Sequence, residues 1–227
     1  MQPSSKQIII EFLRDKKFAT VLDAPSGAGW LATVLAGRAT LDGVDLYADA
    51  KGYRQIWKHD LDAGLPAECG GYDLICCCAG LEHVGNPLLL LREFHRRLPA
   101  DGMLIVATPN VWYPQARLQY FLRGFFPSFP CLAGRIAPGT HMHITPWSWP
   151  QLYLYLKIAG FARFELVPEP LSKAKHLYEH LFVLPARVYC RRRAGRAATA
   201  EERSFWQTAS TSTSLLGRHL IVAAWKA

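Results

Sequence analysis

ATVLDAPSGAG, residues 19–29, is the stretch that decides the fold of this 227-residue chain. Its first six residues are mostly apolar or β-branched and predict a short buried strand. Pro25 and two glycines then break the strand pattern, and residues 30–36 resume as a helix that ends at Gly37. The stretch therefore predicts a strand, a glycine-containing turn and a helix.

The same alternation continues through the first half of the chain. Further strands are expected at residues 39–46, 54–59, 72–79 and 103–110, with a helix at residues 88–98. Asn86 and Pro87 precede that helix as an N-cap and a proline at the first helical position. Because parallel strands need crossover connections, this order predicts a doubly wound, mostly parallel α/β sheet.

The flanks of this pattern complete the predicted architecture. Ser4 and Gln7 have the spacing of a capping box that opens an N-terminal helix, and the chain's second half adds a helix at residues 151–159 and strands at residues 161–167 and 218–225. Residues 111–145 are aromatic and proline-rich, and residues 171–214 combine a helical hairpin with a Ser/Thr-rich loop, TASTSTS. We expect both as cap insertions on a single domain, residues 1–227.

Composition supports a packed core and a basic surface. Half of the residues are hydrophobic and 19% are charged, which argues against disorder over most of the chain. The net charge of +8 suits an acidic partner such as RNA, an anionic lipid or a phosphorylated substrate. Much of the excess lies between Arg187 and Arg203, which indicates one exposed basic segment and makes nucleic acid an unfavoured partner.

The cysteines and the N-terminus indicate the compartment. Cys76, Cys77 and Cys78 are consecutive within an apolar run, where they are typical of small buried hydrophobic residues. No cysteine pair has the spacing of a zinc site, and the sequence has neither a long apolar signal region nor about 18 continuous apolar residues. We expect a cytoplasmic protein, with peripheral contact at the inner membrane face as a further option.

Acidic residues follow three successive predicted strands, where ligands bind in open parallel sheets. Asp23 ends the first strand and Asp60 the third. Asp45 follows the glycine turn by about 20 residues, the spacing at which a carboxylate meets ribose hydroxyls, with Asp42 as its rival. The turn without a ligand, and Asp60 as a solvated turn residue, are the alternatives. Jointly, the three acids predict a site for an adenosine-bearing cofactor.

At this point the sequence resembles the class I S-adenosylmethionine-dependent methyltransferases, particularly bacterial members that modify small molecules, quinones or cell-surface glycans. The similar segments are VLDAPSGAG (21–29), VDL (44–46), HDL (59–61), YDLICCCAGLEHVGNP (72–87), LREFHRRLPADGMLIVATPN (91–110) and HITPWSWPQLYLYLKIAGF (143–161). The resemblance implies a Rossmann-like, seven-stranded sheet with an antiparallel last strand, and S-adenosylmethionine as cofactor.

The resemblance also implies roles for individual residues. Asp23 would serve the methionine amino group through the loop or a water, and Asp45 the ribose. Asp60 and Leu61 would hold the adenine. The full expected cofactor set is Asp23, Ala24, Pro25, Gly27, Gly29, Asp45, Leu46, Asp60, Leu61 and Ala79. Pro25 departs from the family, which usually has glycine there, and so predicts a different local path of the loop.

Histidines supply the candidates for chemistry on the acceptor. His83, just after the fourth strand, is placed to remove a proton from an acceptor hydroxyl, and His83 and Glu82 as helix-initiating and packing residues are the alternative. His141 and His143 are expected in the substrate pocket or in a structural role. Two histidines at this spacing supply too few ligands for a metal, so we predict no metal site.

The segment 174–193 mixes apolar residues with a basic end. A lid helix packed on the domain and a contact with an anionic membrane surface are its two interpretations. The predicted function is methyl transfer to a small-molecule or glycan/lipid-linked acceptor at oxygen. A non-catalytic cofactor-binding module and an RNA methyltransferase are the alternatives, and the sequence leaves the oligomeric state open.

Overall fold

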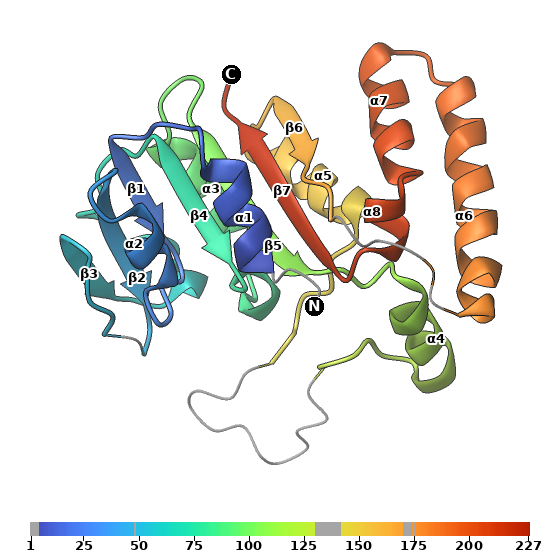
Figure 1. Ribbon diagram of the computed structural model, residues 1–227, viewed down its shortest axis with the longest axis horizontal. Coiled ribbons are helices and arrows are strands. Elements are labelled where there is room, and N and C mark those ends of the chain that lie inside the picture. The colour runs from blue at the N-terminus through green and yellow to red at the C-terminus, as the bar shows by residue number, and fades with distance from the viewer. Residues whose placement is uncertain (1–4, 48, 130–141, 170–173, 175) are drawn as a thin grey trace.

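A computed structural model of the chain describes residues 5–47, 49–129, 142–169, 174 and 176–227 (Figure 1). Seven strands form one sheet in the order β3-β2-β1-β4-β5-β7-β6. Their bounds are β1 Thr20–Asp23, β2 Thr40–Asp45, β3 Gln55–Lys58, β4 Leu74–Cys78, β5 Met103–Pro109, β6 Arg163–Leu166 and β7 His219–Trp225. The first five strands are parallel, and β7 is antiparallel to both of its neighbours. The predicted doubly wound, Rossmann-like sheet with an antiparallel last strand is thus confirmed.

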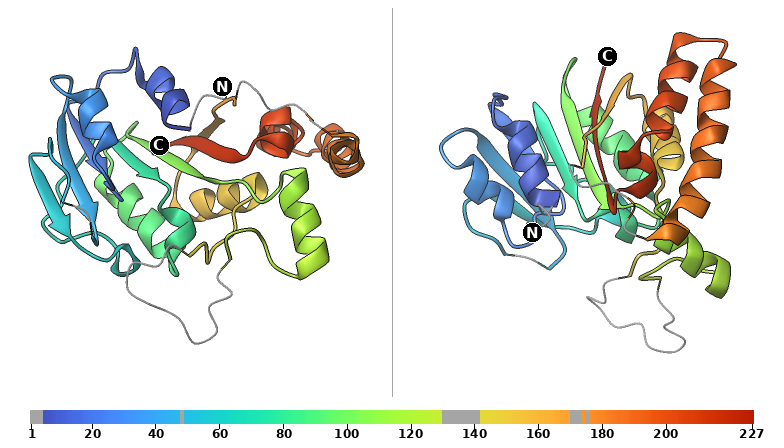
Figure 2. Two further views of the ribbon diagram at one scale, coloured as in Figure 1. Left: turned by 60° about the horizontal axis from the view of Figure 1, so that its bottom comes forward. Right: turned by 45° about the vertical axis from the view of Figure 1, so that its right-hand side comes forward.

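Helices cover both faces of this sheet (Figure 2). They are α1 Ser5–Leu13, α2 Trp30–Leu35, α3 Pro87–Arg97, α4 Pro114–Arg123, α5 Trp149–Ala159, α6 Leu177–Gly195, α7 Ala200–Ala209 and α8 Ser212–Leu216, with short 3₁₀ turns η1 Leu61–Ala63 and η2 Leu81–His83. Helices α1 and α2 lie on one face, and α3 and α5 lie on the other. Because an alternating βα chain winds in both directions from its first strand, both faces become covered.

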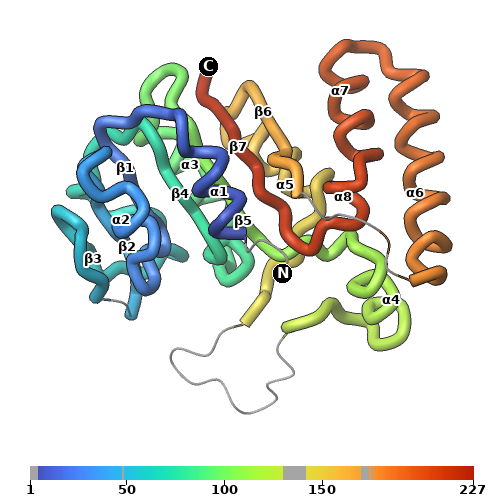
Figure 3. Tube along the Cα trace, viewed as in Figure 1, coloured from blue at the N-terminus to red at the C-terminus, as the bar shows by residue number. Residues whose placement is uncertain are grey.

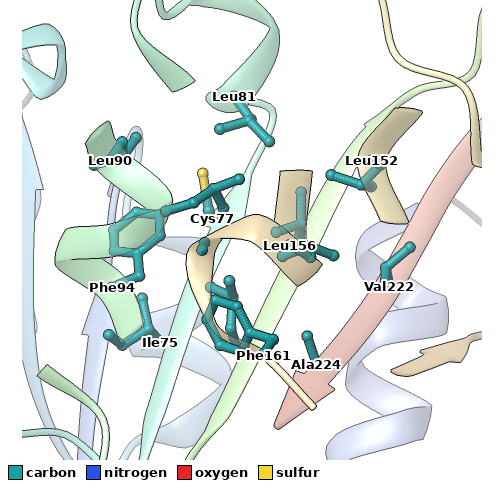
Figure 4. Packing of buried hydrophobic residues seen from close by; sticks show 14 of the residues in the cluster. Ile75, Cys77, Leu81, Leu90, Phe94, Leu152, Leu156, Phe161, Val222 and Ala224 are labelled. Atoms are coloured by element: carbon teal, nitrogen blue, oxygen red, sulfur yellow. The ribbon is translucent and has the colours of Figure 1, made fainter. Parts of the chain in front are cut away.

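Strand β4 shows how the sequence separates the two cores. Its alternate residues Ile75 and Cys77 join the core under α3 and α5, whereas Leu74 and Cys76 join the core under α1 and α2. Figure 4 shows Ile75 and Cys77 beside Phe94 of α3. The prediction that these cysteines act as buried hydrophobic residues is confirmed for Cys76 and Cys77, while Cys78 is half-buried at the strand end.

The helix boundaries on the second face follow their predicted caps. The Asn86 side chain accepts a hydrogen bond from the Leu89 N–H at the start of α3, with Pro87 at the first position. Gly160 ends α5 with φ of +111°, and a Cβ there would lie 2.9 Å from the His95 ring. Only glycine meets both the backbone and the packing requirement at this helix end.

The helical hairpin predicted within residues 171–214 is confirmed as the paired helices α6 and α7. Residues 111–145 are more helical than expected because they contain α4, and residues 212–214 begin α8. The predicted loop TASTSTS is wrong, because the Thr211 side chain accepts from the Ser214 N–H and so starts α8. The predicted cap at Ser4, and residues 130–141, lie outside the described residues.

The parallel strands deliver their carboxyl ends to one edge of the sheet, the lower edge in Figure 3. Helix α4 projects from that same edge beyond β5. Loops that follow β1, β2 and β4 meet there, so chain segments far apart in the sequence surround one space. Within the described residues, no helix has the length and apolar character needed to cross a bilayer.

Candidate functional site

A cavity of about 450 Å³ opens at the carboxyl edge of β1, β2 and β4. Its walls come from the β1 loop, the end of β2, the turn η1 and the loop after β4, with contributions from α1 and α2. The lining residues are Lys6, Pro25, Ser26, Gly27, Ala28, Trp30, Asp45, Leu46, Tyr47, His59, Asp60, Leu61, Asp62, Cys78, Ala79, Gly80, His83, Val84 and Met142. Most of the predicted cofactor residues are therefore brought together around one space.

Asp45 is oriented by backbone donors at the cavity wall. Its Oδ2 accepts from the Gly27 N–H at 2.9 Å, and its Oδ1 accepts from the Tyr47 N–H at 2.9 Å. The rival Asp42 is buried elsewhere, where Arg54 pairs with its two oxygens at 3.0 and 2.5 Å and the Tyr72 hydroxyl donates at 2.9 Å. Asp42 thus anchors β2 to its neighbours, and Asp45 faces the cavity.

The turn η1 places Asp60 and Leu61 in the cavity wall. The Asp60 side chain caps this turn by accepting from the Asp62 N–H at 2.9 Å. Asp62 in turn accepts from the Gly85 and Asn86 N–H groups at 2.6 and 3.1 Å. This second acid, which no sequence pattern indicated, ties the end of β3 to the loop after β4.

The β1 loop divides the predicted residues into wall and support. Asp23 is fully buried, its Oδ2 accepts from the Tyr53 hydroxyl at 2.6 Å, and burial raises its pKa to about 8. Ala24 and Gly29 lie in the support behind the wall, where a Cβ at Gly29 would lie 2.9 Å from the Ala50 Cβ. Asp23, Ala24 and Gly29 are not among the residues that line the cavity, whereas Gly27 is.

Pro25 gives the loop after β1 a local backbone path that a glycine at this position would not need. The Ala24–Pro25 peptide bond is cis, and the proline ring lies against Gly80. A Cβ at Gly80 would lie 2.2 Å from the Pro25 Cδ, so only glycine allows this approach. The loops after β1 and β4 therefore touch at the floor of the cavity.

His83 stands between this cavity and a second one. Its Nδ1 lies 2.8 Å from the Met142 carbonyl oxygen. Since a carbonyl only accepts, Nδ1 carries the hydrogen and Nε2 keeps the lone pair in the neutral ring. The His143 ring meets the His83 ring edge-on at 5.0 Å between centroids. His83 lines the first cavity, while Glu82 and His143 line the second.

Residues 3–165 match the methyltransferase-domain family, which is well over half of the chain. The chain belongs to this family. The match confirms the predicted resemblance to class I S-adenosylmethionine-dependent methyltransferases and assigns S-adenosylmethionine as the cofactor.

Curated relatives match a part of this methyltransferase. A ubiquinone biosynthesis O-methyltransferase of Pseudomonas paraeruginosa is 30% identical over 106 residues, which are 40% of this chain and 44% of the relative. Its counterpart in Glaesserella parasuis is 32% identical over 106 residues, 40% of this chain and 45% of the relative. The chain thus matches less than half the length of these relatives.

Solved structures share the fold over nearly the whole chain. The YcgJ protein of Bacillus subtilis aligns over 96% of both chains with a TM-score of 0.57 and 16% identity. A 1,6-didemethyltoxoflavin N1-methyltransferase of Burkholderia thailandensis aligns over 98% of this chain and 77% of its own with a TM-score of 0.52 and 16% identity. At these identities the likeness shows the fold alone.

The first cavity fits the cofactor of the family. A Cβ built on Gly27 meets no atom within 4 Å, and φ there is +50°, so the glycine leaves room beside the Asp45 carboxylate. The Asp45 carboxylate suits a diol, and the Asp60 and Leu61 pair offers an acceptor beside an apolar surface. The sequence did not indicate Lys6, which α1 brings to the same wall.

The second cavity, of about 620 Å³, is aromatic. Residues of α4, of the segment after it and of the chain before α5 form most of its walls, and Arg218 and His219 lie at the start of β7. The aromatic lining residues are Tyr113, Tyr120, Phe125, Phe126, Phe129 and Trp147. The aromatic segment that the sequence placed in a cap thus lines a pocket next to the cofactor cavity.

Glu82 completes the wall between the two cavities. Its backbone oxygen accepts from the Ile144 and Thr145 N–H groups, and burial raises the pKa of its carboxyl. One ligand atom from each of Glu82, His83 and His143 lies within 4.8 Å of the others. Two imidazoles and a carboxylate are ligand types that a transition metal accepts. The predicted absence of a metal at the histidines rested on sequence spacing, which could not show that Glu82 joins them.

Proposed function

We propose that this methyltransferase transfers the methyl group of S-adenosylmethionine to a hydroxyl oxygen of an apolar, aromatic small molecule or of such a group linked to a lipid or glycan. The observation that carries the proposal is the aromatic cavity that adjoins the cofactor cavity at the His83 wall. An aromatic lining suits a flat, apolar acceptor. The O-methyltransferase names of the curated relatives support oxygen as the methylated atom.

The residues of the chain have separate tasks in this reaction. S-adenosylmethionine supplies an electrophilic methyl group on a sulfonium. Asp45 holds the ribose and Asp60 with Leu61 the adenine, while the aromatic cavity aligns the acceptor and excludes water. The Nε2 atom of His83 accepts the proton of the acceptor hydroxyl, because the Met142 carbonyl holds Nδ1 as the donor.

Two other functions remain as alternatives. A non-catalytic cofactor-binding module would use the first cavity alone, so the presence of the second cavity favours an enzyme that binds an acceptor. An RNA methyltransferase would need several cations along the entrance, whereas Arg218 is the one arginine or lysine among the described residues that line this cavity. The arginines that give the chain much of its charge lie on α6 instead.

Calorimetric titration with S-adenosylmethionine and S-adenosylhomocysteine tests the cofactor site. We expect Asp45→Ala to weaken binding by about 2 to 4 kcal/mol, because one side of a charge-assisted contact to the ribose is removed. This corresponds to about a 30- to 900-fold higher Kd. Asp49→Ala, an exposed acid nearby, is the control and should bind like the wild type. Unchanged affinity in Asp45→Ala would assign the ribose to another acid.

Transfer of a labelled methyl group tests the acceptor class. The label should enter phenolic small molecules or phenols on lipid chains, because these fill an aromatic cavity. RNA and acceptors without a hydroxyl serve as comparisons and should stay unlabelled. Labelled RNA would support the alternative function, and cofactor binding without transfer to any acceptor would support the non-catalytic module.

A further inference from the structure

Helix α6 is the outermost element on its side of the molecule, with α7 between it and the sheet (Figures 1 and 2). Its buried residues Val183, Cys190 and Ala194 lie on one side of the helix. Leu177, with 86% of its surface exposed, and the likewise exposed Leu181, Leu184 and Val188 recur at helical spacing on the opposite side. We call the side that carries these four residues the outer face of α6.

The exposure of these residues favours the membrane interpretation of this segment over the lid interpretation. A lid helix packed on the domain would bury its leucines, but here smaller residues pack inward and the leucines point outward. Four aliphatic residues in one stripe over three helical turns are more apolar surface than a solvated helix face normally carries. The outer face is therefore suited to a partner outside this chain.

Helix α4 packs against α6 and also carries exposed apolar side chains. Helix α4 lies beside the N-terminal end of α6 in Figures 1 and 2. The Arg117 guanidinium of α4 donates to the Phe182 carbonyl oxygen of α6 at 2.7 Å. Phe121, one turn after Arg117, is 81% exposed, and Leu122 is exposed beside it. Tyr120 of the same helix lines the aromatic cavity. Helix α4 therefore contacts α6 and also lines the aromatic cavity.

The charge on the outer face has one sign. Arg191 and Arg192 follow the aliphatic stripe within the same helical face, and both are exposed. Within the described part of the chain, neither takes part in an ion pair. Glu179 is the acidic residue of α6, and it lies on the other side, where its carboxylate accepts from the His176 N–H. The outer face thus joins an apolar stripe to a cationic end.

We propose that the outer face of α6 docks on an anionic lipid surface. The helix lies in the plane of the interface, with its aliphatic side chains at the acyl boundary and Arg191 and Arg192 at the headgroups. The stripe from Leu177 to Val188 is about 16 Å long, enough for a lengthwise contact. Delivery of a lipid-linked acceptor to the aromatic cavity rests on the proposed function, whereas the lipid contact does not.

A second copy of the chain fits this face less well than a lipid surface. A two-fold contact would bring the same patch of both copies together. Such a contact would desolvate arginines without an acid on either side to pair with them. Anionic lipids supply the missing negative charge, so charge complementarity favours the membrane.

Co-sedimentation with vesicles tests the contact without any methyl acceptor. The wild-type chain should bind vesicles of mixed phosphatidylglycerol and phosphatidylcholine, and lose this binding with pure phosphatidylcholine or high salt. Leu181→Glu should weaken binding at least about tenfold. The double variant Arg191→Gln/Arg192→Gln should weaken it about 10- to 30-fold.

Matched controls lie on α3, which is separated from α6 by the rest of the second helical face (Figure 2). Leu89→Glu changes an exposed leucine and the same charge, and Arg92→Gln/Arg96→Gln removes two exposed arginines at helical spacing. Both controls should bind vesicles like the wild type. Absence of binding to anionic vesicles, or equal losses in both sets, would overturn the proposal. Dimerisation in light scattering that Leu181→Glu abolishes would overturn it in favour of a second copy.

Discussion

Replacing His83 with alanine is expected to lower kcat by about 10²- to 10⁴-fold while the affinity for S-adenosylmethionine stays within a few-fold of the wild type. The Met142 carbonyl accepts from Nδ1, so Nε2 is the atom that can take a proton from an acceptor hydroxyl. Single-turnover transfer to a phenol, with cofactor titration alongside, measures both quantities. A loss confined to KM would show that His83 only positions the acceptor.

The choice of acceptor makes this prediction specific for proton removal. A nitrophenol whose hydroxyl is already ionised needs no base, so the loss in His83→Ala should shrink to a few-fold with that acceptor. His180→Ala, an exposed histidine on α6, is the control and should retain the wild-type rate. Equal losses with both acceptors would contradict the role of a base.

A chelator separates the base from a metal site at the same wall. If Nε2 acts on the acceptor proton directly, treatment with a chelator should leave the rate unchanged. Loss of transfer after chelation, restored by a divalent transition metal, would instead assign Glu82, His83 and His143 as ligands. A base uses the Nε2 lone pair of His83 to take a proton, whereas a metal ligand uses the same lone pair to bind the metal. One experiment therefore decides between the two roles.

The alternation of strands and helices could be read from the sequence because its signals are local. Buried parallel strands are short apolar runs, and α3 and α5 begin or end at a proline, asparagine or glycine with a position-specific role. Helix α4 carried the same signals, with Pro114 at its start and Gly124 at its end. Its aromatic content nevertheless favours an irregular insertion. The Ser/Thr-rich composition around Thr211 likewise favours a loop, although threonine also caps helices.

The candidate site could be predicted only where strand topology alone brings residues together. Asp45 and Asp60 end neighbouring parallel strands, so their proximity follows from the fold. His143 meets His83 across about 60 residues of chain, and no spacing rule predicts that contact. The burial of Asp23 was equally hidden, because a strand-end acid reads the same whether it faces the cavity or the core.

Asp23→Asn is expected to stabilise the fold increasingly as the pH rises from about 4 to about 8. Burial raises the pKa of Asp23 from 3.8 to about 8, so in this range the folded chain holds one proton more than the unfolded chain. The wild type therefore loses about 1.4 kcal/mol of unfolding free energy per pH unit from this group, and asparagine, which does not titrate, avoids the loss. Denaturant unfolding at pH 5, 7 and 9 should show an advantage of the variant that approaches the order of 5 kcal/mol.

Tyr53→Phe supplies the test of the cause. The Tyr53 hydroxyl donates to the Asp23 carboxylate at 2.6 Å and favours its ionised form. Removing the hydroxyl should raise the pKa of Asp23 further, so the loss of unfolding free energy with rising pH should continue above pH 8. Asp15→Asn, an exposed acid, should leave the pH profile unchanged. A difference in unfolding free energy between Asp23→Asn and wild type that stays constant from pH 5 to 9 would contradict the raised pKa.

If Asp23 serves the methionine ammonium group, the stabilised variant should also bind the cofactor more weakly. Cofactor binding by the wild type at pH 7 should then release a proton, because a nearby cation favours the ionised carboxylate.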